Sequence, residues 1–304
     1  MGTPEFAVPA LKKLLEEGYN IVGVITATDK FGGRGGKKLI ESDVKKFALE
    51  KGLNILQPKN LKDSDFVEEV KALKADLQIV VAFRMLPEVI WNMPKHGTYN
   101  LHGSLLPKYR GAAPIHWAVI NGEEETGVTS FKLKHKIDTG DLLFQEKTKI
   151  AHEDTTGDVY NRLMHIGAEV VLKTVKAVEN DTIELLKQDE TQVCKAPKIY
   201  HETCEINFNQ PVMKVYNHIR GLAPFPTAWT TIDGLECKIL KSGISDEKNE
   251  GDPPGRILTD NKRYLKIACE DGYLAILDIK MQGKKRMDIK SLLNGYEISS
   301  SLIG

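Results

Sequence analysis

The sequence predicts an α/β protein, in which a Rossmann-like and mostly parallel sheet with helices on both faces is followed by a smaller β-rich domain. Over the first two-thirds, short β-rich apolar runs alternate with amphipathic helical patterns, as in sheets that helices cover on both faces. After about residue 182, closely spaced β-rich runs replace this alternation. The length of 304 residues suits one large domain or two ordinary ones.

The elements of the first part follow from residue type and spacing. Predicted strands lie at 21–25, 53–56, 77–82, 99–102 and 128–133. Predicted helices lie at 5–17, 42–51, 64–74, 113–121 and 156–179. The last helix has Val159, Leu163 and Ile166 at helical spacing, with Thr155 and Asp158 as a cap pair. In such folds ligands bind at the carboxyl ends of the strands.

We predict a first domain at 1–182, a linker at 183–202 and a second domain at 203–304. The linker lacks sustained periodicity, and 242–255 is turn-rich. The second domain is predicted to have a helix at 211–221 and strands at 228–232, 236–241, 255–259, 263–268 and 273–281. This pattern is typical of a small β-barrel or sandwich.

Composition limits the kinds of partner. With 42 basic and 42 acidic residues the net charge is zero, so any nucleic-acid binding must use local basic patches. No run approaches the ~18 apolar residues of a membrane span, and the amino terminus does not resemble a signal peptide. Cys194, Cys204, Cys237 and Cys269 form no Cys-x-x-Cys pair, which favours reduced, mostly buried thiols in a cytoplasmic protein. The eight histidines form no ligand-spaced cluster, so no metal is expected.

Three polar side chains are candidates for acyl-transfer chemistry. Asn100 and His102 are two apart near the end of an apolar run, a spacing that places both on one face of a strand. An amide donates to a developing oxyanion, and an imidazole exchanges protons with a nitrogen. A carboxylate such as Asp138 fixes the tautomer of an imidazole. Polar groups that satisfy a strand end, and a turn residue in Asp-Thr-Gly, are alternative interpretations.

The segment Asn100-Leu101-His102-Gly103-Ser104-Leu105-Leu106-Pro107-Lys108-Tyr109-Arg110-Gly111-Ala112-Ala113-Pro114-Ile115 resembles the signature of the folate-dependent formyltransferases. Segments 1–7, 33–39, 125–129, 137–141 and 219–229 also fit, in the same order, so the likeness covers nearly the whole chain. The resemblance implies transfer of a formyl group from 10-formyltetrahydrofolate to the α-amine of methionyl-initiator tRNA. It also implies an OB-like barrel in the second domain.

The resemblance implies a role for each polar residue. The Asn100 amide and a protonated His102 stabilise the oxyanion, and Asp138 orients His102 or an intervening water. Losing one such donor costs roughly 3–4 kcal/mol of barrier. Either His102 or that water takes the proton of the attacking amine. Two alternatives remain: a formyltransferase for a small amine, such as glycinamide ribonucleotide or an amino sugar, and a non-catalytic nucleic-acid-binding protein.

The folate is expected beside the strand at 77–82. The resemblance implies that it is bound by Met85, Leu86, Pro87, Ser104, Leu105, Leu106 and Pro107. The loop after that strand looks one residue shorter than usual in the family and carries Arg84, which is either a solvated cation or part of the site. Ser104 lacks the Gly-x-Ser-x-Gly context of a nucleophile, so we expect it to shape its loop.

Two basic groups are expected to contact tRNA by analogy with the family. One is the glycine-rich loop 31–38 with Arg34, Lys37 and Lys38, in which an extra glycine departs from the usual pattern. The other is the only dense basic cluster of the second domain, Lys280, Lys284, Lys285 and Arg286. A solvated loop and a solvated hairpin end are the alternatives. Nothing in the sequence demands more than a monomer.

The resemblance finally implies a first, central strand ahead of Met1-Gly2-Thr3-Pro4. A sheet without a buried strand exposes two edges of unpaired backbone groups. We therefore expect the natural protein to begin several residues upstream.

Overall fold

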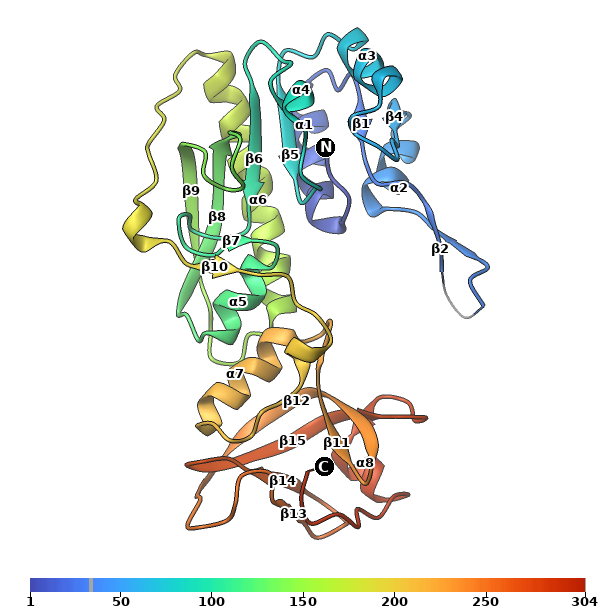
Figure 1. The fold of residues 1–304 in the computed structure, drawn as a ribbon, viewed down its shortest axis with the longest axis vertical. Coiled ribbons are helices and arrows are strands. Elements are labelled where there is room, and N and C mark those ends of the chain that lie inside the picture. Colours follow the sequence, from blue (N-terminus) through green and yellow to red (C-terminus); the bar gives the residue numbers. More distant parts are fainter. Residues whose placement is uncertain (33–34, 304) are drawn as a thin grey trace. The chain divides into compact units, whose positions relative to one another are not determined.

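The computed structural model describes residues 1–32 and 35–303, which fold into two compact units (Figure 1). The first unit comprises Met1–Pro114, Thr126–Thr148 and Tyr160–Ala196. The second comprises Ile115–Glu125, Lys149–Val159 and Pro197–Gly304. Each unit therefore contains more than one stretch of chain, whereas the sequence-based domains are continuous.

The sheet of the first unit has two separate parts. In one, β1 (Val24–Ile25) pairs in parallel with β4 (Ile55–Leu56). The other has the order β5 (Gln78–Val81), β6 (Thr98–His102), β8 (Glu125–Lys132) and β9 (Leu142–Lys149). β6 is parallel to β5 and antiparallel to β8.

Helices cover this sheet. They are η1 (Glu5–Ala7), α1 (Val8–Glu16), α2 (Asp43–Glu50), α3 (Ser64–Ala72), α4 (Glu88–Trp91) and α6 (Thr156–Glu179). All of α5 (Pro114–Ile120) except its first residue belongs to the second unit. Asp63 starts α3 because its carboxylate accepts from the Asp65 and Phe66 amides. α6 packs on β6, since a Cβ on Gly167 would lie 2.6 Å from Leu101 Cδ2. The predicted Rossmann-like class is thereby confirmed.

Two short pairings complete the first unit. β2 (Lys30–Gly32) and β3 (Lys38–Ile40) form an antiparallel hairpin. β10 (Lys195–Ala196) pairs in parallel with β7 (Arg110–Gly111), and Leu186 bridges to Leu142. The segment predicted as a linker is therefore hydrogen-bonded to the first unit as far as residue 196; it also contains η2 (Glu190–Gln192).

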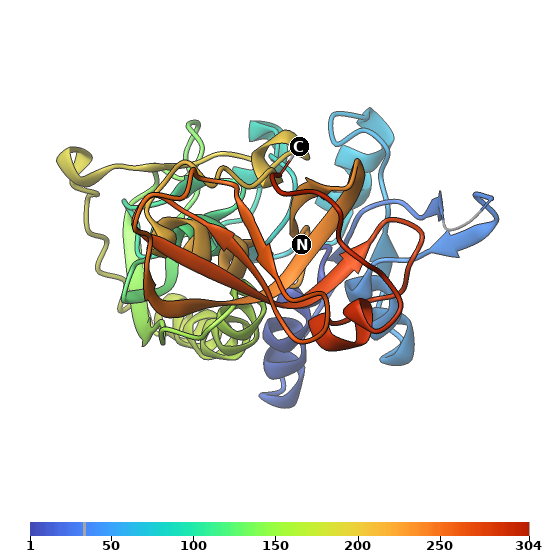
Figure 2. The same ribbon diagram turned by 90° about the horizontal axis from the view of Figure 1, so that it is seen from below.

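The second unit is built on a six-stranded antiparallel sheet, whose long strands are seen in orange and red in Figure 2. Its elements are η3 (Glu202–Cys204), α7 (Val212–Leu222), β11 (Ala228–Ile232), β12 (Leu235–Lys248), β13 (Ile257–Thr259), β14 (Leu265–Ala268), β15 (Gly272–Met281), β16 (Met287–Asp288) and α8 (Ile289–Leu293). Side chains from α7, α8 and the sheet form one buried cluster. The turn-rich prediction for 242–255 is wrong up to Lys248, because β12 stays paired with β15 that far, with bulges.

Asp233 ties the carboxyl-terminal segment to the turn between β11 and β12. Its carboxylate accepts from Tyr296 OH at 2.9 Å, from Ser299 Oγ at 2.9 Å and from the Ser300 amide at 2.6 Å. Desolvation raises its pKa, but hydrogen bonds from Ser300, Tyr296 and Ser299 outweigh that effect and lower it from 3.8 to about 2.

We predict that Asp233→Asn lowers the Tm by roughly 2–5 °C at pH 7, because the charged acceptor is lost. The folded pKa is below the unfolded one, so the contribution is present above pH 3.8 and is lost as the pH falls through about 2. In thermal melts from pH 2 to 7, the Tm values of the unsubstituted protein and of Asp233→Asn should converge at the acid end. Asp181→Asn, at an exposed position with the same left-handed backbone, is the control and should change little.

Candidate active site

The carboxyl end of β6 carries the first two predicted catalytic residues. Asn100 and His102 lie on one face of this strand, opposite Phe131 and Thr129 of β8. Asn100 is half-buried, and within the described residues its amide forms no side-chain hydrogen bond. His102 is 6% exposed. The edge therefore offers a free amide beside a buried imidazole.

The His102 ring is held between a carbonyl and a carboxylate. Its Nε2 lies 2.8 Å from the Tyr109 carbonyl oxygen, which can only accept, so this nitrogen carries a proton. Its Nδ1 lies 3.8 Å from Asp138 Oδ2, close enough for an ion pair with a charged ring but too long for a direct hydrogen bond. The tertiary structure thus brings together residues 36 positions apart.

The position of Asp138 is set by its neighbours. The residue is 8% exposed and has a left-handed backbone, with φ 54°. Its Oδ2 accepts from the Gly111 amide at 2.9 Å, and its carbonyl accepts from Gln188 Nε2 at 2.8 Å. Gly111 has φ 131°, and a Cβ there would lie 2.4 Å from the Ala196 carbonyl oxygen. Only glycine fits this approach.

The loop after β6 is organised by buried polar contacts. Ser104 is 0% exposed, and its hydroxyl donates to the Lys108 carbonyl at 2.6 Å. Thr129 Oγ1 donates to the Ser104 carbonyl and accepts from the Leu106 amide. Gln145 Nε2 donates to the Leu106 carbonyl at 2.8 Å. Ser104 and Leu106 therefore point into the protein, whereas Leu105 and Pro107 are half-buried.

The second predicted folate segment follows β5. Met85 is 73% exposed, Leu86 is buried, and Pro87 precedes α4 at its N-cap position. Arg84 donates through NH1 to the Lys59 carbonyl at 2.9 Å and through NH2 to the Pro58 carbonyl. Arg84 is exposed, in agreement with a solvated cation, and its guanidinium also holds this loop against the segment after β4.

The basic loop of the first unit is flanked by the β2–β3 hairpin. Lys37 and Lys38 are exposed, as are the apolar side chains of Phe31 and Leu39. Arg34, predicted to contact tRNA, lies outside the described residues. Exposed apolar and basic side chains on one hairpin suit a surface that binds a partner.

The basic cluster of the second unit lies around the end of β15. Lys280 and Lys285 are exposed, and Lys284 Nζ lies 5.3 Å from the centre of the Tyr296 ring. Arg286 instead forms a two-point ion pair with Asp278, with NH2 2.7 Å from Oδ2, so much of its charge is neutralised.

Some functional candidates were not predicted from the sequence. Lys238 of β12 lies directly opposite Lys280 of β15. Like charges that face each other across two strands are destabilising, and a bound anion would relieve this repulsion. Tyr109 and Gln188 position His102 and Asp138. The spacing of polar residues does not reveal the contacts of Lys238 and Gln188, because these join segments distant in sequence. Tyr109 is only seven residues from His102, but it acts through its backbone carbonyl, which residue type does not reveal.

Other site types find no support in the described part of the chain. Residues 1–32 and 35–303 contain no cluster of His, Cys, Asp and Glu suited to a metal ion. Within the same ranges, no helix has the length and apolar character needed to cross a membrane. The four cysteines are free thiols, and three of them are buried.

Comparison with known proteins identifies the family. The family described as Formyl transferase matches residues 1–175, and the formyl transferase C-terminal domain matches residues 198–297. The chain therefore belongs to the formyl transferase family, which confirms the resemblance found in the sequence.

Individual relatives are more specific. The chain is 51% identical to methionyl-tRNA formyltransferase of Bacteroides thetaiotaomicron, over 98% of this chain and 95% of the relative. It is 50% identical to that of Parabacteroides distasonis, over 98% and 94%. Among solved structures, a sugar 3N-formyl transferase crystallised in the presence of dTDP and 5-N-formyl-THF has a TM-score of 0.67 and 22% identity. It covers 93% of this chain and 97% of its own, a likeness of fold alone.

We predict that Ser104→Ala lowers the Tm by roughly 2–5 °C, because a buried hydrogen bond is lost. It should reduce kcat for formyl transfer less than about tenfold, since the hydroxyl faces the protein interior. His102→Ala, measured alongside, should lose far more. A loss for Ser104→Ala as large as for His102→Ala would instead indicate a nucleophilic serine.

Proposed function

We propose that this protein transfers the formyl group of 10-formyltetrahydrofolate to the α-amine of methionyl-initiator tRNA, for translation initiation. The observation that carries the proposal is 51% identity to a methionyl-tRNA formyltransferase over 98% of the chain. A match of this length includes both the unit that carries Asn100 and His102 and the carboxyl-terminal module.

The polar residues divide the chemistry between them. Folate supplies the formyl group, and the new bond joins its carbon to the amine nitrogen. Asn100 donates its free amide to the formyl oxygen, where negative charge develops. His102 Nδ1 takes the amine proton, directly or through a water, because Nε2 is already bonded to Tyr109. The Asp138 carboxylate, 3.8 Å away, stabilises the imidazolium so formed. The amine proton finally replaces the formyl group on the folate nitrogen.

The fit for folate rests on two segments that flank β5 and β6. Backbone groups of Met85, Leu86 and Pro87, and the half-buried Leu105 and Pro107, are proposed to hold it. Ser104 and Leu106 contribute by fixing the course of their loop, because their side chains are buried. No metal takes part in this scheme.

tRNA is proposed to bind through basic groups on both units. These are Arg34, Lys37 and Lys38 in the first unit, and Lys280, Lys284, Lys285 and Lys238 in the second, with a smaller part for Arg286. We retain 1–182, 183–202 and 203–304 as the proposed catalytic domain, linker and tRNA-contacting domain. A monomer acting in the cytoplasm fits this function.

The alternative substrate is a small amine. Two solved formyltransferases share the fold, each at a TM-score of 0.67. One is the sugar 3N-formyl transferase, and the other is an N-formyltransferase from Helicobacter canadensis in complex with folinic acid and dTDP-3-aminofucose. Both are only 22% identical to this chain. The identity of 50% or more to tRNA-specific relatives therefore favours tRNA.

The assay that tests the function offers three acceptors in parallel. Labelled 10-formyltetrahydrofolate is incubated with methionyl-initiator tRNA, glycinamide ribonucleotide and dTDP-3-aminofucose. We expect label on the tRNA alone. Label only on a small amine would support formyl transfer but refute tRNA as the acceptor. Label on none of the three acceptors would refute both claims.

We predict that Asn100→Ala reduces kcat about 10²–10³-fold, the loss typical of one oxyanion donor. The Tm should change little, because this amide has no partner within the described residues. Single-turnover transfer and a thermal melt measure the two quantities. Asn180→Ala, an exposed control, should alter neither; an unchanged kcat for Asn100→Ala would remove Asn100 from the mechanism.

The affinity for tRNA should fall linearly as log K against log salt concentration. We predict that Lys280→Ala and Lys285→Ala each make this slope less steep by roughly 0.7–0.9. Arg286→Ala should reduce the steepness less, because Asp278 already neutralises that guanidinium. Filter binding at several salt concentrations measures the slopes, with Lys12→Ala as the control. Equal slopes for all four variants would place the tRNA elsewhere.

A further inference from the structure

The acceptor for the Nε2 proton of His102 belongs to a strained piece of backbone. This acceptor is the Tyr109 carbonyl oxygen, which lies 2.8 Å from Nε2. Tyr109 is buried and has φ 60°. A bulky residue rarely adopts this left-handed conformation, which persists only where neighbouring groups hold it. The groups that hold the backbone of Tyr109 therefore decide where the acceptor for His102 lies.

Cys194 holds the backbone on both sides of Tyr109. Its Sγ accepts from the Tyr109 amide at 3.1 Å, and its carbonyl accepts from the Arg110 amide at 3.0 Å. Cys194 and Tyr109 are 85 positions apart in the sequence, and they meet where β7 pairs with β10 (Figure 1). A single residue just before β10 thus accepts from two successive amides.

The geometry of the peptide group connects these contacts to His102. The Tyr109 carbonyl and the Arg110 amide belong to one planar group, in which C=O and N–H point in opposite directions. When Cys194 holds the N–H, the C=O is directed to the other side, where His102 lies. The preceding peptide group is held at both ends, because its carbonyl, that of Lys108, accepts from Ser104 Oγ at 2.6 Å. Its N–H is the Tyr109 amide, which Cys194 Sγ holds.

The thiol of Cys194 is used differently from two others in the chain. The Sγ atoms of Cys204 and Cys237 donate to carbonyls four and two positions away in the sequence. Such contacts satisfy a buried thiol locally and connect no distant segments. Cys194 Sγ instead accepts from a distant amide, so the contact needs an acceptor atom at position 194, which sulfur or oxygen supplies.

The contact bears on the reaction proposed above, on which this inference rests. A proton on Nε2 of the neutral His102 ring leaves Nδ1 free to take the proton of the attacking amine. If the Tyr109 carbonyl moved away, Nε2 would lose its acceptor. The neutral ring would then gain by placing its proton on Nδ1, which lies 3.8 Å from Asp138 Oδ2. In that tautomer Nδ1 has no lone pair for the amine proton.

We propose that Cys194 is a positioning residue for His102. Its thiol and its carbonyl together hold the backbone around Tyr109, whose carbonyl keeps the proton of the neutral His102 ring on Nε2. Cys194 acts on the reaction through His102 alone. The property that the site uses is the ability of the sulfur to accept a hydrogen bond, not the reactivity of the thiol.

The test replaces Cys194 by residues that differ in the acceptor atom. Cys194→Ser keeps an acceptor, Cys194→Val is apolar and has none, and Cys194→Ala has none and adds no volume. Cys204→Val, in the second unit, is the matched control, because it removes a thiol whose contact is local. Steady-state formyl transfer gives kcat and KM. NMR of protein with isotope-labelled histidine shows which nitrogen of His102 carries the proton, with the signals assigned by their loss in His102→Gln.

Cys194→Val and Cys194→Ala should each lower kcat roughly tenfold, the factor that corresponds to one hydrogen bond. The KM for tRNA and for folate should change little, because neither ligand loses a contact. In both variants the His102 signals should shift toward the tautomer with the proton on Nδ1. Cys194→Ser should keep the Nε2–H tautomer and most of kcat, and Cys204→Val should match the unsubstituted protein in both measurements.

The tautomer decides the outcome. An Nε2–H ring that persists in both Cys194→Val and Cys194→Ala would overturn the proposal. An equal change in Cys194→Ser would also overturn it, because packing and not the acceptor would then matter. Cys194→Ala keeps the comparison valid if the branched valine prevents folding. The NMR measurement does not depend on catalysis, so a shifted tautomer in a protein that fails to formylate tRNA would support this inference and refute the proposed function.

Discussion

The hydrogen bond from the Gly111 amide to Asp138 Oδ2 is the contact on which the candidate site most depends. It holds the carboxylate beside the buried His102, and Gly111 is itself fixed by the pairing of β7 with β10. The close approach of the Ala196 carbonyl leaves no room for a side chain at Gly111. The backbone of β10 thus helps to place a carboxylate at position 138.

Charge in this protein acts locally. The chain has no net charge, and many of its lysines and arginines are paired with acids, as Arg286 is with Asp278. The cations best placed for a polyanion are those that the fold sets against one another, such as Lys238 and Lys280. Like charges on neighbouring strands weaken the sheet slightly, and a bound phosphate backbone would relieve that repulsion.

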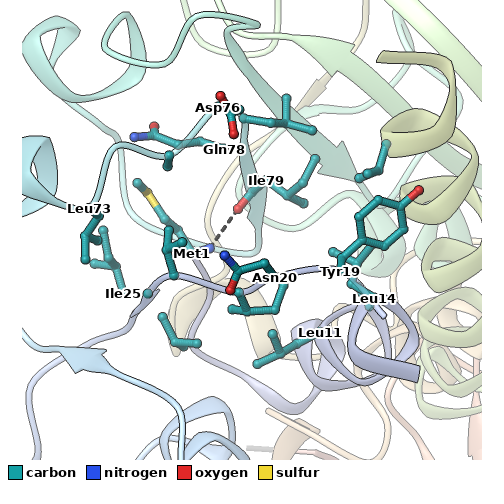
Figure 3. Close-up of a pocket in the computed structure, with 18 of the residues that line it drawn as sticks. Met1, Leu11, Leu14, Tyr19, Asn20, Ile25, Leu73, Asp76, Gln78 and Ile79 are labelled. Atoms are coloured by element: carbon teal, nitrogen blue, oxygen red, sulfur yellow. Dashed lines mark hydrogen bonds between the residues drawn. The ribbon is translucent and has the colours of Figure 1, made fainter. Parts of the chain in front are cut away.

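In the first unit, the strand that carries the candidate site is paired on both sides, and the sheet is divided into two parts. β6 is paired on both sides, with β5 and with β8. The backbone that carries Asn100 and His102 is therefore held in place by hydrogen bonds to two neighbouring strands. β5 is paired along its length with β6; on its other side, among the described residues, it pairs with Met1 and Gly2. A cavity of about 380 Å³, lined in part by residues of β1 and β5, lies one strand away from β6 (Figure 3).

The sequence by itself determined the fold class, the positions of most helices and strands, and the family. Hydrophobic periodicity and short motifs are local properties, and the polar signature from Asn100 to Ile115 is continuous along the chain. The spacing of two residues also predicted that Asn100 and His102 lie on one face, because side chains alternate between the two faces of a strand. By contrast, the continuation of β12 to Lys248 and the attachment of residues 183–196 to the first unit were missed, since ladder pairing overrides local turn composition.

Only the tertiary structure decided which groups meet. The contacts of His102 with Tyr109 and of Asp138 with Gln188 join segments whose spacing carries no signal. The same holds for the burial of the Ser104 hydroxyl, the use of Arg84 to hold its loop, and the neutralisation of Arg286. The physical reason is common to all of these: hydrogen bonds and ion pairs depend on distances of about 3 Å between atoms, and chain folding, not sequence spacing, sets those distances.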